Sequence, residues 1–187
     1  MNMTDPISKA YLESAIVMKG DYPYFINPIS DGNPAITKEL LDAITDRIVS
    51  LSDLDCDVIL APEAMAIPYA TAVSLRTGKP FQVIRKRSHG LEGEISVEQS
   101  TGYSAGRMYL NFLKKGMRAI IIDDVISTGG TFRSIVNTLR SNGIIIEEAI
   151  FILDKSKDID AIASELGLKI HTILKVAVKD GTPVILE

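Results

Sequence analysis

The sequence contains no tryptophan, one cysteine and only two histidines among its 187 residues. A single cysteine, Cys56, cannot form an intrachain disulfide, which fits a reducing compartment. His89 and His171 stand too far apart in the chain to predict a metal cage. The sequence therefore predicts a protein held together by its apolar core, without a metal site built from its own side chains.

Long apolar runs and an excess of basic residues are also missing. No stretch approaches the ~20 apolar residues of a transmembrane helix, and the first residues lack the basic and apolar regions of a signal peptide. The formal net charge of -4 gives no general attraction to nucleic acids or anionic membranes. We therefore expect a cytoplasmic protein with no nucleic-acid or membrane partner, in which any anion site is built locally.

The sequence alternates short apolar runs with segments of helical periodicity. Strands are predicted at 57–61, 81–84, 119–123 and 144–153, and near 172–178 and 182–186; helices are predicted at 5–18, 37–51, 66–76, 131–142 and 158–166. Residues 22–28 indicate an edge strand or an ordered loop, and residues 86–106 a long loop or ribbon. This order favours an α/β fold with a central parallel sheet flanked by helices, in one domain over residues 1–187. Ligands of such sheets bind at the carboxyl ends of the strands.

One loop combines the groups that a sugar phosphate requires. An apolar strand runs into Asp123 and Asp124, and Ser127-Thr128-Gly129-Gly130-Thr131 then opens a helix. Glycines let the backbone approach an anion, and the N–H groups of a helix N-terminus attract negative charge. The two carboxylates suit ribose hydroxyls instead, or a magnesium ion held through water. The loop lacks the lysine of a nucleotide P-loop and the G-x-G-x-x-G pattern of dinucleotide sites.

The strand, the sequence DDVISTGGT and the following helix resemble the motif by which type I phosphoribosyltransferases bind 5-phosphoribosyl-1-pyrophosphate (PRPP). The resemblance extends from about Tyr22 to Asp154. The stretches APEAMAIPYATAVSLRTGKPFQVIRKRSHGLEGE, VEQSTGYSAGRMYLN and DDVISTGGTF resemble the archaeal hypoxanthine/guanine phosphoribosyltransferases, which are similar to adenine phosphoribosyltransferases. The resemblance implies a type I phosphoribosyltransferase fold, with a small hood formed by the N-terminal segment and the C-terminal strands. It also implies a homodimer.

The resemblance implies a purine-salvage enzyme that condenses a purine base with PRPP and releases a nucleoside monophosphate and pyrophosphate. Asp123 and Asp124 would hold the ribose hydroxyls during catalysis, and Ser127, Thr128, Gly129, Gly130 and Thr131 would hold the 5-phosphate. Mg²⁺ would arrive with PRPP and contact Asp123 or Asp124 through water. Glu63, Ala64 and Met65 match the pyrophosphate loop, and Arg85, Lys86 and Arg87 would supply positive charge for the diphosphate.

The remaining implied residues concern the lid and the base. Residues 86–106 resemble a catalytic lid, in which Glu98 would act as acid or base and Tyr103 would close over the site. Phe25 would stack on the purine. Lys155 would reach a 6-oxo group.

Two positions leave the base open between hypoxanthine/guanine and adenine. Typical 6-oxopurine enzymes carry an acidic residue where this chain has Ser127, whereas adenine enzymes usually have arginine at Met65. Orotate enzymes usually have lysine at the position of Met65, so the sequence resembles orotate phosphoribosyltransferases less than the purine enzymes. The similarity of residues 61–132 to the archaeal group favours the 6-oxopurines. A PRPP-sensing regulator of transcription is the alternative from another class, but such proteins usually add a basic winged-helix segment.

Overall fold

The computed structural model describes residues 5–20, 22–101 and 104–186, and in these residues the chain forms ten strands and six helices. The strands are β1 (Ala15–Lys19), β2 (Tyr22–Ile26), β3 (Val58–Pro62), β4 (Phe81–Ile84), β5 (Ile95–Thr101), β6 (Ser104–Leu110), β7 (Arg118–Ile126), β8 (Ile145–Asp154), β9 (Lys169–Lys179) and β10 (Thr182–Ile185). The helices are α1 (Pro6–Leu12), α2 (Pro28–Asp31), α3 (Lys38–Leu51), α4 (Ala66–Thr77), α5 (Gly130–Ser141) and α6 (Ile159–Leu166).

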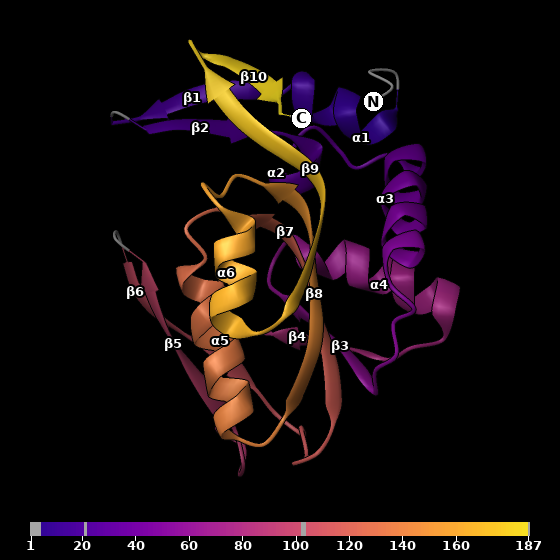
Figure 1. Ribbon diagram of the computed structural model, residues 1–187, viewed down its shortest axis with the longest axis vertical. Helices are drawn as coiled ribbons and strands as arrows, with labels where there is room; N and C mark the ends of the chain where they lie inside the picture. The colour runs from indigo at the N-terminus through magenta and orange to yellow at the C-terminus, as the bar shows by residue number, and fades with distance from the viewer. Residues whose placement is uncertain (1–4, 21, 102–103, 187) are drawn as a thin grey trace.

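A six-stranded sheet in the order β10-β9-β8-β7-β3-β4 forms the centre of the described molecule (Figure 1). Its neighbours pair in parallel from β4 to β9, and only β10 runs antiparallel. Helices α3 and α4 pack on one face, and α5 and α6 on the other. Strand β3 is buried over its whole length, as a strand covered on both faces should be. The predicted α/β fold with a central, mostly parallel sheet is confirmed.

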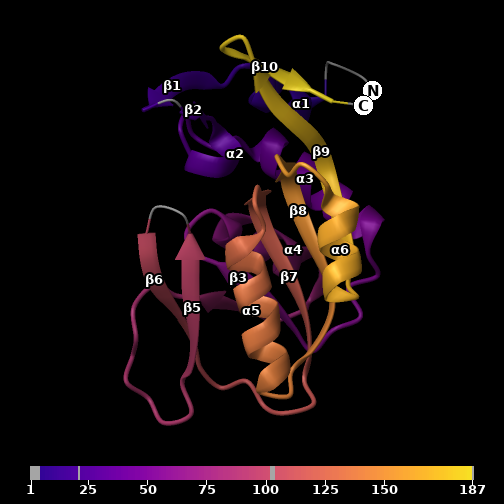
Figure 2. The same ribbon diagram turned by 60° about the vertical axis from the view of Figure 1, so that its left-hand side comes forward.

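The N-terminal elements and the C-terminal strands meet at one end of the molecule (Figures 1 and 2). We call this end, made of residues 6–31 and 176–185, the hood. Its core is continuous with the α3–α4 side of the sheet and includes Tyr11, Phe25 and Ile29. The Tyr11 hydroxyl donates to the carbonyl of Ala177, 2.8 Å away, so a side chain of α1 ties the N-terminal half of the hood to β9.

The sequence-based prediction of one helix over residues 5–18 is wrong beyond Leu12. The helix ends at Leu12, and the N–H group and the hydroxyl of Ser14 both donate to the carbonyl of Tyr11, at 3.0 and 2.5 Å. Residues 15–19 then pair antiparallel with β2, for example Val17 opposite Tyr24. The apolar residues at 15 and 16 fit a helical spacing equally well, so only the pairing with a later segment selects the strand.

A short helix that was not predicted, α2, follows β2. The Asn27 side chain accepts hydrogen bonds from the N–H groups of Ile29 and Ser30 at 2.8 and 3.1 Å, and Pro28 occupies the first helical position. Asn followed by Pro is a local signal for a helix start. Gly32 ends the helix in the left-handed conformation, with a φ of 62°. Helix α2 lies over the carboxyl end of β7 (Figure 2).

Residues 86–106, predicted as a loop or ribbon, contain β5 and the first part of β6. These two strands form an antiparallel ribbon separate from the main sheet, which runs beside α5 toward the hood (Figure 2). Ile95 and Val97 bury one face of the ribbon in the core beneath α5. Within the described ranges, no helix is long and apolar enough to cross a membrane.

We expect Tyr11→Phe to lower the free energy of unfolding by about 1 kcal/mol, because the Ala177 carbonyl loses its side-chain donor. For a chain of this size, that loss corresponds to a fall in Tm of about 2–4 °C. Thermal unfolding followed by circular dichroism measures it. Tyr109→Phe is the matched control, since no hydrogen bond to the Tyr109 hydroxyl occurs within the described residues. An equal fall in both variants would contradict a specific role for the Tyr11 bond.

Candidate active site

The loop after β7 forms a concave surface at the carboxyl end of the sheet. A hollow of about 220 Å³ is lined by residues of the loop and its neighbours, namely Asp123, 125–132 and Phe151. Gly129 has a φ of 76°, and a Cβ there would lie 2.6 Å from a guanidinium nitrogen of Arg133. Helix α5 begins at Gly130 without a side-chain cap from Gly129, and the N–H group of Gly130 donates to the Thr128 hydroxyl oxygen at 3.4 Å. The N-terminus of a helix favours an anion.

Asp123 and Asp124 lie at the end of β7, with one facing the loop hollow and the other facing the hood. The N–H group of Asp124 donates to Oδ1 of Asp123 at 2.9 Å. Burial, followed by the charge of Asp124, raises the pKa of Asp123 well above its ordinary value. Burial also raises the pKa of Asp124, to which the charge of Asp31 adds. Ligand hydroxyls or a cation would stabilise the two ionised carboxylates.

A second hollow, of about 200 Å³, opens between the end of β7 and the hood. It is lined by Tyr24, Phe25, Ser30, Asp124, Val125, Ser127 and Lys155. Val125 and Ser127 also line the first hollow, so the two adjoin. Phe25 is only 5% exposed and packs edge-on against Tyr11, with ring centroids 5.4 Å apart. The Lys155 ammonium lies 4.9 Å from the centroid of the Phe25 ring.

A third element of the site is the turn from β3 into α4. The N–H group of Lys86 donates to the Glu63 carboxylate at 2.6 Å, which ties this turn to the segment after β4. The Glu63–Ala64 peptide is cis, and α4 starts after Met65 without a side-chain cap. The Met65 side chain reaches the hood, where its Cε lies 3.5 Å from the position that a Cβ on Gly32 would take. Burial and the charge of Asp124 raise the pKa of Asp123, and the charge of Lys86 lowers it by less.

Residues 33–180 match the model of the phosphoribosyl transferase domain. The chain belongs to the phosphoribosyltransferase family. It is 46% identical over 185 residues to a hypoxanthine/guanine phosphoribosyltransferase of Methanohalophilus mahii, covering 99% of this chain and 97% of the relative. It is 47% identical over 172 residues to the enzyme of that name from Methanococcus maripaludis, covering 92% and 93%.

Solved phosphoribosyltransferases share the fold. The adenine phosphoribosyltransferase of Thermoanaerobacter pseudethanolicus superimposes with a TM-score of 0.74 at 20% identity, over 90% of this chain and 99% of that one. The adenine phosphoribosyltransferase of Saccharomyces cerevisiae, solved with adenine, gives a TM-score of 0.72 at 18% identity, over 90% and 98%. At these identities the likeness concerns the fold alone.

In this phosphoribosyltransferase the structure brings together most of the residues that the sequence singled out. Asp123, Asp124, the loop 127–131, Phe25 and Lys155 line the two adjoining hollows. Arg85 does not join them, because its backbone bridges to Tyr109 and it lines a different hollow beside β4. Its neighbour Arg87 is exposed.

Of the two predicted lid residues, Glu98 does not line either hollow. Glu98 lies on the exposed face of the ribbon, where its carboxylate pairs with Arg107 at 3.4 Å. Its side chain is 81% exposed. Tyr103 lies outside the described residues. The lid function of residues 86–106 stays a prediction.

Arg133, which contacts the loop without lining the hollow, was not predicted from the sequence. One guanidinium nitrogen donates to the carbonyl of Thr128 at 2.7 Å. The Nε and the other terminal nitrogen bind the Glu165 carboxylate at 2.8–2.9 Å. Arg133 therefore links the loop to α6. The hydrogen bond from Arg133 also lowers the pKa of Glu165. One helical turn separates Arg133 from Gly129, which is the local signal that could have revealed the contact.

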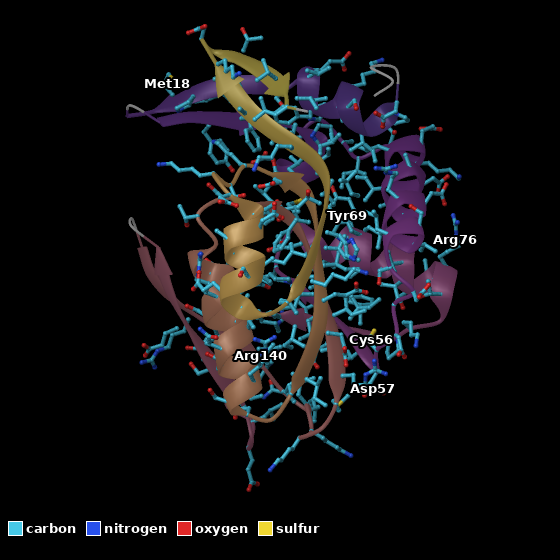
Figure 3. All side chains as sticks on the ribbon, viewed as in Figure 1. Met18, Cys56, Asp57, Tyr69, Arg76 and Arg140 are labelled. Atoms are coloured by element: carbon cyan, nitrogen blue, oxygen red, sulfur yellow. The ribbon has the colours of Figure 1, made fainter. Side chains whose placement is uncertain are left out.

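Tyr69 is a second missed residue, and it joins the hood to the sheet. From α4, its hydroxyl donates to the carbonyl of Ile29 in α2 at 2.7 Å (Tyr69 is labelled in Figure 3). Burial, together with the charge of Asp124, raises the pKa of Tyr69. The phenol therefore stays neutral and holds α2 over the aspartates. A hydroxyl inside an apolar helix pattern gave no sign of this partner 40 residues away.

Asp123→Asn should separate activity from stability. Since burial raises the pKa of Asp123, its ionisation costs the folded state stability as pH rises from 3.8 through the raised pKa. Asparagine does not ionise, so the variant should gain Tm relative to wild type as pH increases across this window. Its kcat/KM should fall at least about 10-fold, equivalent to about 1.4 kcal/mol. Asp57→Asn, at the end of the sheet away from the hood (Figure 3), is the control. Full activity in Asp123→Asn would contradict the site.

Arg133→Ala should weaken PRPP binding, because the Thr128 carbonyl loses its donor and the loop loses its contact with α6. We expect the KM for PRPP to rise about 10-fold, with a smaller change in the KM for the base. Steady-state kinetics with each substrate varied in turn measures this. Arg140→Ala removes an equal charge from the far end of α5 and serves as the control (Figure 3). If both variants behave alike, this link between the loop and α6 has no specific role.

Proposed function

We propose that this protein is a purine-salvage enzyme that transfers the 5-phosphoribosyl group of PRPP to hypoxanthine or guanine, giving IMP or GMP and pyrophosphate. The observation that carries the proposal is the identity of 46–47% over almost the whole chain to relatives named hypoxanthine/guanine phosphoribosyltransferase. The fold and the family match agree with this activity.

The two adjoining hollows suit the two halves of a nucleotide. Backbone N–H groups of the loop 127–131 and the N-terminus of α5 would bind the 5-phosphate in the first. Phe25 and Lys155 would face the base in the second. Asp123 and Asp124 stand where the hollows meet, and would accept hydrogen bonds from the ribose hydroxyls. Ionised carboxylates there would also stabilise the positive charge that develops on the ribose as the diphosphate leaves.

The diphosphate needs positive charge and N–H donors on the other side of the aspartates. The start of α4 would supply the N–H group of Ala66, since Ile67 donates to the Ala64 carbonyl at 3.2 Å and Pro68 has no N–H group. Lys86, whose charge lowers the pKa of Asp123 against the larger effect of burial, would supply a cation. Magnesium bound with PRPP would neutralise part of the diphosphate charge. No group of three or more His, Cys, Asp and Glu side chains among the described residues could hold a metal, so we propose that Asp123 or Asp124 contacts the ion through water.

Lys155 supports a 6-oxopurine over adenine. An ammonium group only donates hydrogen bonds, which suits the O6 acceptor of hypoxanthine and guanine, whereas adenine carries a donor at that position. A pocket built for one pattern leaves buried groups unpaired with the other, at ~1–3 kcal/mol per group. The adenine phosphoribosyltransferases among the solved structures keep adenine as the second candidate.

The lid, its residues, the location and the oligomeric state are further proposals. We propose that residues 86–106 close over the site as a lid, and that Glu98 then acts as acid or base for the purine. Tyr103 would close with it. Arg85 and Arg87 would reach the diphosphate only in a different arrangement of this segment. We also propose that the protein is a cytoplasmic homodimer.

A competition assay tests the reaction and the base. With PRPP and magnesium, hypoxanthine and adenine are supplied together and the nucleotides are separated by chromatography. We expect kcat/KM for hypoxanthine to exceed that for adenine at least about 10-fold, which requires only about 1.4 kcal/mol. Lys155→Ala should erode this ratio. If AMP dominates the product, the base assignment is wrong and the phosphoribosyl transfer stands.

The absence of turnover with hypoxanthine, guanine, adenine, xanthine and orotate would refute the enzyme. The remaining candidate would then be a PRPP-sensing regulator, which a gel shift against the promoter DNA of its own gene, with and without PRPP, would detect. The net charge of -4 disfavours this alternative.

A further inference from the structure

The hood contains a carboxylate that gathers several hydrogen bonds at the edge of the base hollow. Asp31, the last residue of α2, accepts from the Tyr24 hydroxyl at 3.0 Å through Oδ1. Through Oδ2 it accepts from the Ser30 hydroxyl at 2.7 Å and from the N–H group of Asn27 at 3.2 Å. None of these contacts belongs to the PRPP machinery. Asp31 does not line the hollow itself, but Tyr24 and Ser30 do.

These bonds fix the direction of the Ser30 proton. A serine hydroxyl has one proton and two lone pairs. The proton of Ser30 is directed at a carboxylate, which is a stronger acceptor than a neutral group and can only accept. The oxygen therefore presents lone pairs to the rest of its surroundings. Toward the base hollow, Ser30 is an acceptor and not a donor.

Hydrogen bonds also fix the backbone on which Ser30 lies. Asn27 caps the N–H groups of Ile29 and Ser30, and the Tyr69 hydroxyl holds the carbonyl of Ile29 at 2.7 Å. Helix α2 is thus anchored both to its own cap and to α4 of the main body. Asn27, Ile29 and Tyr69 are fully buried. An acceptor held in this way needs little reorganisation when a ligand binds.

Five polar side chains line the hollow, and two of them, Ser30 and Lys155, are of opposite kind; the others are Tyr24, Asp124 and Ser127. Lys155 can only donate, and Ser30, with its proton committed to Asp31, can only accept. A 6-oxopurine carries an acceptor at O6 next to a donor at N1, and guanine adds a donor at its 2-amino group. Adenine carries the reverse at both positions.

We infer that Ser30 is a specificity-determining residue that accepts a hydrogen bond from the N–H edge of a 6-oxopurine, and that Asp31 is the positioning residue that keeps Ser30 an acceptor. This inference rests on the proposed function, and assigns part of the base preference to the hood. The charge of Asp31 also raises the pKa of Asp124, in addition to the larger effect of burial.

Four variants test the inference: Ser30→Ala, Asp31→Ala, Asp31→Asn and the double variant Ser30→Ala/Asp31→Ala. For each, kcat and KM are measured with hypoxanthine, guanine, adenine and PRPP. We expect Ser30→Ala and Asp31→Ala each to reduce the ratio of kcat/KM for hypoxanthine over adenine at least about 5-fold, mainly through the KM of the 6-oxopurine. The KM for PRPP should change less than about 2-fold.

Asp31→Asn separates orientation from charge. The amide oxygen of asparagine can still accept from Ser30 and Asn27, so this variant should keep most of the preference although it has lost the negative charge. In the double variant, the loss should equal that of Ser30→Ala alone, because Asp31 acts through Ser30. Ser50→Ala, in the last turn of α3 with its hydroxyl bonded to the Arg47 carbonyl, is the control for a serine substitution.

Three results would overturn the inference. An unchanged base ratio in Ser30→Ala would remove the acceptor role. Equal losses in Asp31→Asn and Asp31→Ala would assign the effect to charge, and additive losses in the double variant would make the two residues independent. If Asp31→Ala does not fold, Ser30→Ala and Asp31→Asn still decide the matter. Failure of the proposed function is distinct, since the wild-type protein would then turn over no base.

Discussion

Two carboxylates stand side by side at the end of β7, in a place where burial disfavours the charge of both. Burial and mutual repulsion raise the pKa of Asp123, and burial raises that of Asp124. A fold does not gain stability from such a pair. The groups around the pair are suited to the charged and polar parts of a ligand. They are the Lys86 ammonium, the N-terminus of α5 after the loop, and the hood next to Asp124. The site is organised to receive a ligand that brings hydroxyls or a cation to the aspartates.

The sequence predicts the parts of the site in which the functional side chains and the backbone that positions them belong to one short segment. Asp123, Asp124 and the loop 127–131 are contiguous, and the conformation at Gly129 follows from a turn that only glycine tolerates easily. The parallel sheet was predictable for a similar reason, since each buried strand is a local apolar run. Resemblance to a known family added Phe25 and Lys155, which are 130 residues apart and have no local pattern in common.

What escaped prediction depends on contacts between distant segments. Residues 15–19 became a strand because β2 pairs with them, although their apolar spacing suited a helix. Arg85 and Lys86 are adjacent and both cationic, but Arg85 lines the hollow beside β4, whereas the charge of Lys86 lowers the pKa of Asp123. The bond from Tyr69 to Ile29 and the bonds that converge on Asp31 join residues through side-chain oxygens, which leave no periodicity in the sequence.

The division of the site into loop and hood separates two kinds of recognition. On the proposed function, the loop would bind phosphate through backbone N–H groups. Substitution of its side chains would leave those groups in place, so the loop is characteristic of the reaction class rather than of the base. The hood contributes side-chain hydroxyls whose protons are directed by Asp31, and a single substitution there can turn an acceptor into a donor. Relatives with the same fold and a different base can therefore keep the loop and change the hood. The relatives at 46–47% identity carry the hypoxanthine/guanine name, while the solved structural neighbours at 18–20% identity, which include adenine enzymes and a UMP synthase, share the fold alone.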